Sequence, residues 1–74
     1  MTRVRQLPIA PIHRLIKSAN AERVSDEAAK VLRDILEEIG FSIAQRAIEI
    51  AKHANRKTVT AEDIRLAYRF MKSR

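Results

Sequence analysis

Apolar residues between Asp26 and Asn55 recur at intervals of three and four, the period of one helix face. The stripe consists of Ala28, Leu32, Ile35, Leu36, Ile39, Ile43, Ala47, Ile50, Ala51 and Ala54. Val31, Ala44 and Ile48 widen it beyond a single face, which is typical of a helix with neighbours on several sides. A coiled-coil stalk is the alternative, but the stripe lacks a strict seven-residue repeat. The pattern predicts one central helix of about thirty residues.

The predicted helix is long for the size of the chain. Thirty residues of helix span about 45 Å, whereas a compact globule of 74 residues is roughly 29 Å across. A chain this short is also near the limit at which a single hydrophobic core is stable. We therefore expect a partner subunit to cover the central helix.

A shorter helix is predicted before the central one. Pro8 and Pro11 suit a first helical turn, and the apolar spacing that follows ends near Ser18. Asn20 can take the left-handed conformation that terminates a helix, and Ser25 is a good N-cap for the central helix. The first helix is therefore expected to contain about ten residues.

A second short helix is predicted after the central one. Asn55 repeats the terminating signal, and Thr60 and Asp63 have the spacing of a capping box. The apolar positions that follow are Ile64, Leu66, Ala67, Phe70 and Met71. The predicted fold class is all-α, with a short, a long and a short helix joined by two links.

The positive charge lies on the flanks of the chain. Residues 1–25 and residues 56–74 each carry a formal charge of +4, whereas the central helix carries −2. Basic residues concentrated in two links beside helix ends are typical of a protein that binds a polyanion. Phosphate contacts of this kind are strong at low salt and largely independent of sequence.

Several classes of protein are not expected. The chain has no cysteine, two histidines on different helices, and neither a glycine-rich phosphate loop nor an HExxH motif. No stretch approaches the roughly 18 apolar residues of a membrane span. We therefore predict a soluble, intracellular protein that is not an enzyme, with no catalytic or metal site, cofactor, small-molecule substrate or membrane partner.

Four segments in order resemble an archaeal-type histone. They are Leu7-Pro8-Ile9-Ala10-Pro11-Ile12 with Arg14, Ala21-Glu22-Arg23-Val24-Ser25, Ala51-Lys52-His53-Ala54, and Arg56-Lys57-Thr58-Val59-Thr60-Ala61-Glu62-Asp63-Ile64. The resemblance covers residues 7–72 without gaps. It implies the histone fold, in which two chains form a head-to-tail handshake homodimer. The domain organisation would be a short basic lead over residues 1–6 and a single histone-fold domain over residues 7–74.

The resemblance also implies a function and a set of DNA-binding residues. The chain would wrap and compact double-stranded DNA largely without sequence specificity, as a chromatin protein of the cytoplasmic nucleoid. The implied DNA-binding residues are Arg14, Lys17, Arg23, Arg56, Lys57 and Thr58. Arg3, Arg5 and His13 are further candidates, with solvation or, for the arginines, disorder as the alternative.

Contacts between chains are implied as well. The first link of one chain would lie beside the second link of the other, and Gly40 would mark the point where the two long helices cross. Dimers would join into tetramers or longer arrays through Ile50, His53, Asp63 and Leu66, while Arg56 and Asp63 would pair within the chain. A paralogue could replace the second copy.

Three alternatives stay open at this point. The chain could be a histone-fold interaction subunit of a transcription complex, a protein that bridges DNA instead of wrapping it, or a sequence-specific helix-turn-helix regulator. Asn20 stands where many relatives have glycine, so its side chain adds bulk where stacked dimers approach each other. The role of Phe41, an aromatic residue among polar neighbours, is open.

Overall fold

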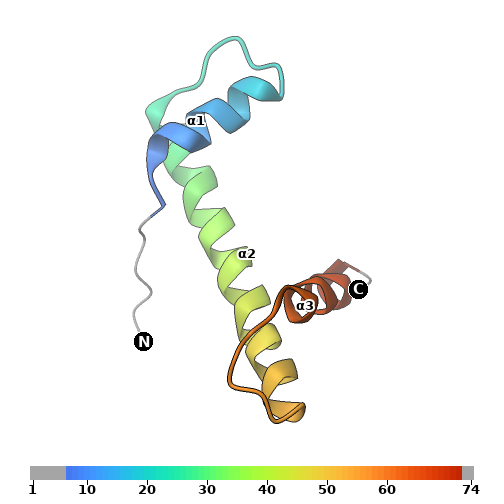
Figure 1. Ribbon diagram of the computed structural model, residues 1–74. Helices are drawn as coiled ribbons and strands as arrows, with labels where there is room; N and C mark the ends of the chain where they lie inside the picture. The colour runs from blue at the N-terminus through green and yellow to red at the C-terminus, as the bar shows by residue number, and fades with distance from the viewer. Residues whose placement is uncertain (1–6, 73–74) are drawn as a thin grey trace. The chain divides into compact units, whose positions relative to one another are not determined.

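The computed structural model describes residues 7–72, and within them the chain forms three helices and no strand (Figure 1). Helix α1 spans Ile9–Ser18, α2 spans Asp26–His53 and α3 spans Ala61–Lys72. The predicted all-α order of a short, a long and a short helix is confirmed. The candidate residues Arg3 and Arg5 lie outside the described residues.

Helix α2 contains 28 residues and runs through two compact units of the chain. The first unit ends at Glu38 and combines α1 with the first part of α2, and the second begins at Ile39 and combines the rest of α2 with α3. At about 1.5 Å per residue, α2 is about 42 Å long. The predicted single domain over residues 7–74 stays a prediction.

In each link the second residue after the helix is an asparagine in the left-handed conformation, as predicted. Asn20 has a φ of 86° and Asn55 a φ of 59°. After α2 the Asn55 amide donates to the Lys52 carbonyl and the Arg56 amide to the Ala51 carbonyl, both at 2.9 Å, which is the Schellman arrangement. The helix therefore ends at His53, two residues before the predicted boundary.

Side chains cap the second and third helices. Ser25 Oγ accepts a 3.0 Å hydrogen bond from the Ala28 amide at the start of α2. Before α3 the Asp63 amide donates to Thr60 Oγ1 at 3.3 Å, and the Thr60 amide donates back to Asp63 Oδ2 at 2.9 Å. This reciprocal pair is the predicted capping box, with aspartate in the place of the more usual glutamate.

The buried apolar side chains are small. Among the described residues they are Ile12 in the first unit with Ala29, and Ala47, Ala51 and Ala67 in the second. No large side chain of the described residues is fully buried. Eleven large apolar residues are exposed instead, namely Leu7, Leu15, Val31, Ile35, Ile39, Ile48, Val59, Ile64, Leu66, Tyr68 and Phe70. The helices of one chain therefore lack the core that a stable fold requires.

Candidate nucleic-acid interface

The second link is held in shape by Arg56 and Asp63. Arg56 Nη1 donates to Asp63 Oδ2 at 2.8 Å and Nη2 donates to Oδ1 at 2.9 Å, so the pair is bidentate. Arg56 Nη1 also donates to the Thr58 carbonyl at 3.2 Å. The Asp63 side chain is only 2% exposed, whereas that of Arg56 is 40% exposed. The partly exposed guanidinium of Arg56 thus holds the conformation of the link through its hydrogen bonds to the buried Asp63 carboxylate and the Thr58 carbonyl.

The same contacts shift two pKa values. Hydrogen bonds from Arg56, and then from the Thr60 amide, hold the pKa of the Asp63 carboxyl well below its usual range. The hydrogen bond to Asp63 raises the pKa of Arg56. Since Asp63 has a lower pKa in the folded chain than in the unfolded one, it stabilises the fold above the unfolded pKa, near 4. That stabilisation is lost as the pH falls toward the folded pKa.

Asp63→Asn should lower the melting temperature at neutral pH, because Arg56 loses its anionic partner and the capping box loses an acceptor. We expect a decrease of about 5–10 °C. The difference in melting temperature between the variant and the wild-type protein should narrow as the pH falls below about 4. Circular-dichroism melts at one protein concentration measure this effect, with Glu62→Gln as the exposed control on α3. A difference in melting temperature that stays constant across the acid range would contradict the stabilising role of the ionised Asp63 carboxylate.

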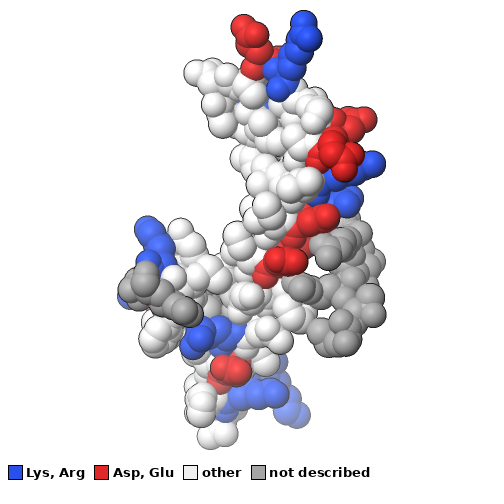
Figure 2. Space-filling model, turned by 180° about the vertical axis from the view of Figure 1, so that it is seen from behind, with Lys and Arg blue, Asp and Glu red and all other residues white. Residues whose placement is uncertain are grey.

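Lys57 and Thr58 follow Arg56 in the second link and are both exposed. Within the described residues Lys57 forms no ion pair, and the Thr58 hydroxyl makes no hydrogen bond. Figure 2 shows lysine and arginine side chains grouped at the C-terminal end of α2 and the link that follows it. Three residues of this link are predicted to bind DNA. The Arg56 guanidinium is hydrogen-bonded to Asp63, whereas Lys57 and Thr58 face solvent.

The first link presents Arg23. Its side chain is exposed and forms no ion pair with any described residue, including the neighbouring Glu22. Glu22 instead accepts, through its backbone carbonyl, a 2.6 Å hydrogen bond from Lys17 Nζ. The Lys17 ammonium group therefore crosses the link and supports it, and the contact with DNA predicted for this residue stays a prediction.

The N-terminus of α1 differs from those of the other two helices. Pro8 is its N-cap and provides no side-chain hydrogen bond, and the first turn contains no acidic residue. By contrast, α2 and α3 are capped by Ser25 and Thr60 and carry acidic residues in their first turns. The free amides and the positive dipole end of α1 are therefore available to an anion. Arg14, on the same helix, is exposed.

His13 has a partner that the sequence did not suggest. Its Nε2 lies 3.0 Å from Asp26 Oδ1 at the start of α2. The imidazole is 29% exposed, whereas the Asp26 side chain is 86% exposed. In the structure His13 therefore connects α1 to the N-terminus of α2, and the phosphate contact considered from the sequence stays a prediction.

The four residues predicted to join dimers all belong to the second unit. Ile50 and His53 come from the last turns of α2, and Asp63 and Leu66 come from the first turns of α3. His53 is exposed, Ile50 is partly buried and Leu66 is 37% exposed. Asp63 Oδ1 accepts one hydrogen bond, from Arg56, and retains capacity for a second.

Residues 7–72 offer neither a metal site nor a membrane span. No group of three or more histidine, cysteine, aspartate or glutamate residues there could hold a metal ion. None of the described helices combines the length and the apolar character needed to cross a membrane.

The sequence did not suggest the contact of Arg46 with Phe70, whose ring centre lies 5.5 Å from the guanidinium carbon. The only signal in the sequence is the helical period, which could place Arg46 on the side of α2 that faces α3 and Phe70 on the side of α3 that faces α2.

Comparison with known proteins identifies the family. Residues 5–68 match the family described as histone-like transcription factor (CBF/NF-Y) and archaeal histone. The chain is 60% identical over 62 residues to one of the subunits of the archaeal histone HAN1 of Thermococcus zilligii, covering 84% of this chain and 92% of that protein. It is 48% identical over 64 residues to probable archaeal histone 3 of Methanocaldococcus jannaschii, covering 86% and 96%.

A eukaryotic relative is more distant. The transcriptional activator hap3 of Schizosaccharomyces pombe is 38% identical over 63 residues, which cover 82% of this chain and 54% of that protein. Both archaeal matches extend over nearly the whole of the related protein, and the three-helix architecture agrees with them. The chain belongs to the family of archaeal histones and histone-like transcription factors, and within it to the archaeal-type histones.

Proposed function

We propose that this chain is a chromatin protein that wraps and compacts double-stranded DNA largely without sequence specificity. The observation that carries the proposal is the state of the two links: Arg23 and Lys57 are exposed and form no ion pair within the described residues. Cations without protein partners can neutralise phosphates, and each phosphate contact releases counterions. Two relatives are named archaeal histones, which supports this function.

The active species is a dimer. Eleven large apolar side chains are exposed on the described part of one chain, and most of them lie on α2 and α3. One apolar hollow of about 490 Å³ follows the first turns of α2 and is lined by Ser25, Glu27, Ala28, Val31, Leu32 and Ile35. A second histone-fold chain in a handshake would cover these surfaces, whether a second copy or a paralogue.

Gly40 marks the crossing of the two long helices in this dimer. Within the described chain, a Cβ atom built on Gly40 would meet nothing within 4 Å. A glycine inside a helix costs about 1 kcal/mol relative to alanine, and no contact of the single chain explains it. Close approach of the second copy's backbone supplies a reason.

DNA contacts then fall at three places on each dimer. The first link of one chain beside the second link of the other joins Arg23 to Lys57 and Thr58, once at each end. Arg14 and the uncapped N-terminus of α1 form the central site. Amides and a lysine bind phosphate, and an arginine can enter an inward-facing minor groove without reading bases. Lys17 and Arg56 maintain the shape of the links.

Dimers associate further through Ile50, His53, Asp63 and Leu66. His53 would donate a hydrogen bond to the free acceptor position on Asp63 of the next dimer, beside the apolar contact of Ile50 with Leu66. We further propose that the molecule resides on the chromosome, in the cytoplasmic nucleoid, with a structural and not an enzymatic role, and its membership of the archaeal-type histones supports this proposal.

A second candidate function is pairing with a different histone-fold chain in a transcription assembly. The match to the transcriptional activator hap3 favours it. Binding to duplexes of unrelated sequence, measured over a range of salt concentrations, separates the two functions. A compaction protein binds all duplexes alike with a steep salt dependence, whereas an adaptor binds DNA weakly or not at all without its partner.

A further inference from the structure

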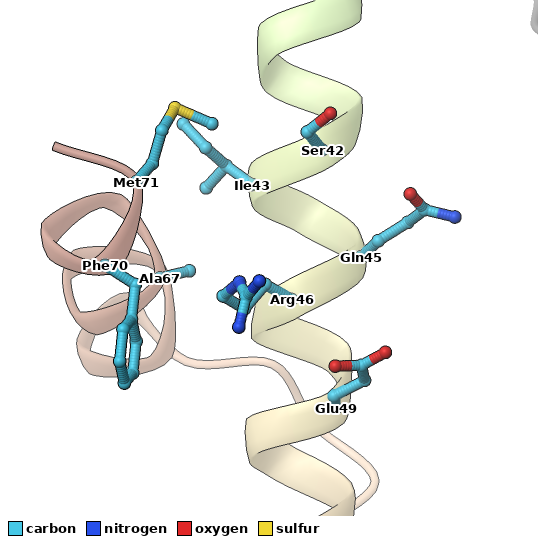
Figure 3. Close-up of a pocket in the computed structure, with 8 residues that line it drawn as sticks. All are labelled: Ser42, Ile43, Gln45, Arg46, Glu49, Ala67, Phe70 and Met71. Carbon is cyan, nitrogen blue, oxygen red and sulfur yellow. The ribbon is translucent and has the colours of Figure 1, made fainter. Parts of the chain in front are cut away.

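The two short helices are held against α2 in different ways. In the second unit a groove of about 520 Å³ lies between α2 and α3, and the Arg46 side chain extends from α2 toward Phe70 (Figure 3). In the first unit, Ile12 is the only residue of α1 that is buried. Because so little apolar surface of α1 is buried, its hydrogen bonds to α2 have more influence on its position.

Two carboxylates of α2 hold the segment that contains α1. Glu37 Oε2 accepts a 2.8 Å hydrogen bond from the amide of Leu7, the residue before the Pro8 N-cap. Asp26 Oδ1 lies 3.0 Å from the Nε2 atom of His13, in the middle of α1. All these residues belong to the first unit of the chain, so each contact forms within one subunit.

The two carboxylates lie on one face of α2. Four residues follow each other at the three- and four-residue intervals of a helix face, namely Asp26, Ala29, Arg33 and Glu37. Ala29 is fully buried and Arg33 is partly buried, as expected for the face that carries α1. Asp26 and Glu37 are about 16 Å apart along the helix. Contacts this far apart determine both the position and the direction of α1 on α2.

The contact of His13 also sets the rotation of α1 about its own axis. Successive residues of an α-helix are about 100° apart around the axis, so a His13 that points toward α2 places Arg14 on another side. The His13 imidazole is 29% exposed, and Arg14 is exposed. The Leu7 contact places the start of α1, where Pro8 provides no side-chain cap for the first amides. The two contacts therefore determine where Arg14 and the free amides point.

We infer that Glu37 and Asp26 are positioning residues for the central DNA site. Through Leu7 and His13 they direct Arg14 and the N-terminus of α1 toward DNA phosphates. The inference rests on the proposed function, since it concerns one of the DNA contacts proposed there. A carboxylate has the same sign of charge as phosphate, so its removal by itself strengthens DNA binding. Removal of either positioning carboxylate should instead weaken it.

The first test compares Glu37→Ala with Glu38→Ala, the same change at an exposed neighbour on α2. We expect Glu37→Ala to lower the affinity for duplexes of unrelated sequence on the order of tenfold, and Glu38→Ala to leave it unchanged or slightly higher. Fluorescence anisotropy measures the affinity, and circular dichroism confirms folding. A folded Glu37→Ala protein that binds DNA as tightly as Glu38→Ala would overturn the inference.

Glu37→Gln is the conservative variant for the same test. Its side-chain oxygen can still accept the hydrogen bond from the Leu7 amide, so it should retain most of the affinity that Glu37→Ala loses. Its NH₂ group would replace Oε1, which is buried and receives no hydrogen bond from any described residue. If Glu37→Gln and Glu37→Ala lose the same affinity, the hydrogen bond to Leu7 does not position the site.

A double-variant comparison separates a role at the central site from a general loss of stability. In the Glu37→Ala background, Arg14→Ala should cost less affinity than it does in the wild-type protein, because Arg14 is already misdirected. Lys57→Ala, at the end of the dimer, should cost the same in both backgrounds. An undiminished cost of Arg14→Ala would overturn the inference. If the wild-type protein fails to bind duplexes of unrelated sequence, the proposed function fails instead.

The second contact is tested with Asp26→Ala and Glu27→Ala. Each variant removes one exposed carboxylate from the first turn of α2, but His13 lies against Asp26. We expect Asp26→Ala alone to weaken DNA binding, by about threefold because the pair is partly exposed. This comparison also tests the inference if Glu37→Ala does not fold. Tighter binding by Asp26→Ala would show that Asp26 competes with phosphate for His13, and would overturn its positioning role.

Discussion

Replacing Ile39 with aspartate should unfold the protein at micromolar concentration. Ile39 lies on α2 next to Gly40 and is 42% exposed in the single chain. In the proposed dimer it is buried at the helix crossing, so the variant would lose an apolar side chain and place an unpaired carboxylate between two chains. The expected cost is at least about 4 kcal/mol, a large fraction of the total stability of a small domain.

Circular dichroism and sedimentation measure this effect together, since folding and dimerisation should be lost in the same step. Glu38→Asp is the matched control, because it introduces the same residue one position earlier at an exposed polar site. The control should remain a helical dimer. A folded Ile39→Asp monomer would show that one chain is stable alone and would contradict the role assigned to the apolar surface.

The double variant Arg23→Ala, Lys57→Ala should bind every DNA sequence more weakly. Each dimer would lose four cations at its two ends. Since each phosphate contact contributes about 0.9 to the slope of log affinity against log salt, the slope should fall by about 3 to 4. At physiological salt the affinity should fall on the order of 100-fold, equally for duplexes of unrelated sequence, because phosphate contacts carry no base information.

The matched control is Lys30→Ala, Lys72→Ala, which removes the same number of charges from exposed positions on α2 and α3 that lie outside the two links. We expect a much smaller decrease in affinity and slope, as long-range attraction alone is screened at this ionic strength. Fluorescence anisotropy across a salt series measures both quantities. Equal losses in the two double variants would show that net charge, and not the links, determines binding.

The helices could be predicted from sequence because their signals are local. Asn20, Asn55, Ser25 and the pair Thr60–Asp63 each act within a few residues, and all four took the predicted conformation or hydrogen bond. The family resemblance then supplied a prediction that local signals could not, namely that a second histone-fold chain is the missing partner. The excess of exposed apolar residues in one chain agrees with the prediction that such a partner exists.

Side-chain contacts between elements could not be predicted in the same way. The sequence did not suggest that Lys17 donates to the Glu22 carbonyl or that His13 lies against Asp26, and the DNA contacts predicted for Lys17 and considered for His13 stay predictions. Which group a long side chain reaches depends on how α1 packs on α2, and the apolar spacing does not determine that packing. For the same reason, the contact of Arg46 with Phe70 became visible only in the structure.

Limited nuclease digestion of the protein reconstituted on random-sequence DNA tests wrapping most directly. Three contact sites per dimer, each at an inward-facing minor groove about 10 bp from the next, predict protected fragments that grow in steps of about 30 bp. The length of the longest protected fragment would show how many dimers stack in one array, and therefore whether the side chain of Asn20 limits stacking. A ladder with this step is the expected result, and uniform digestion or one discrete footprint would contradict wrapping by successive dimers.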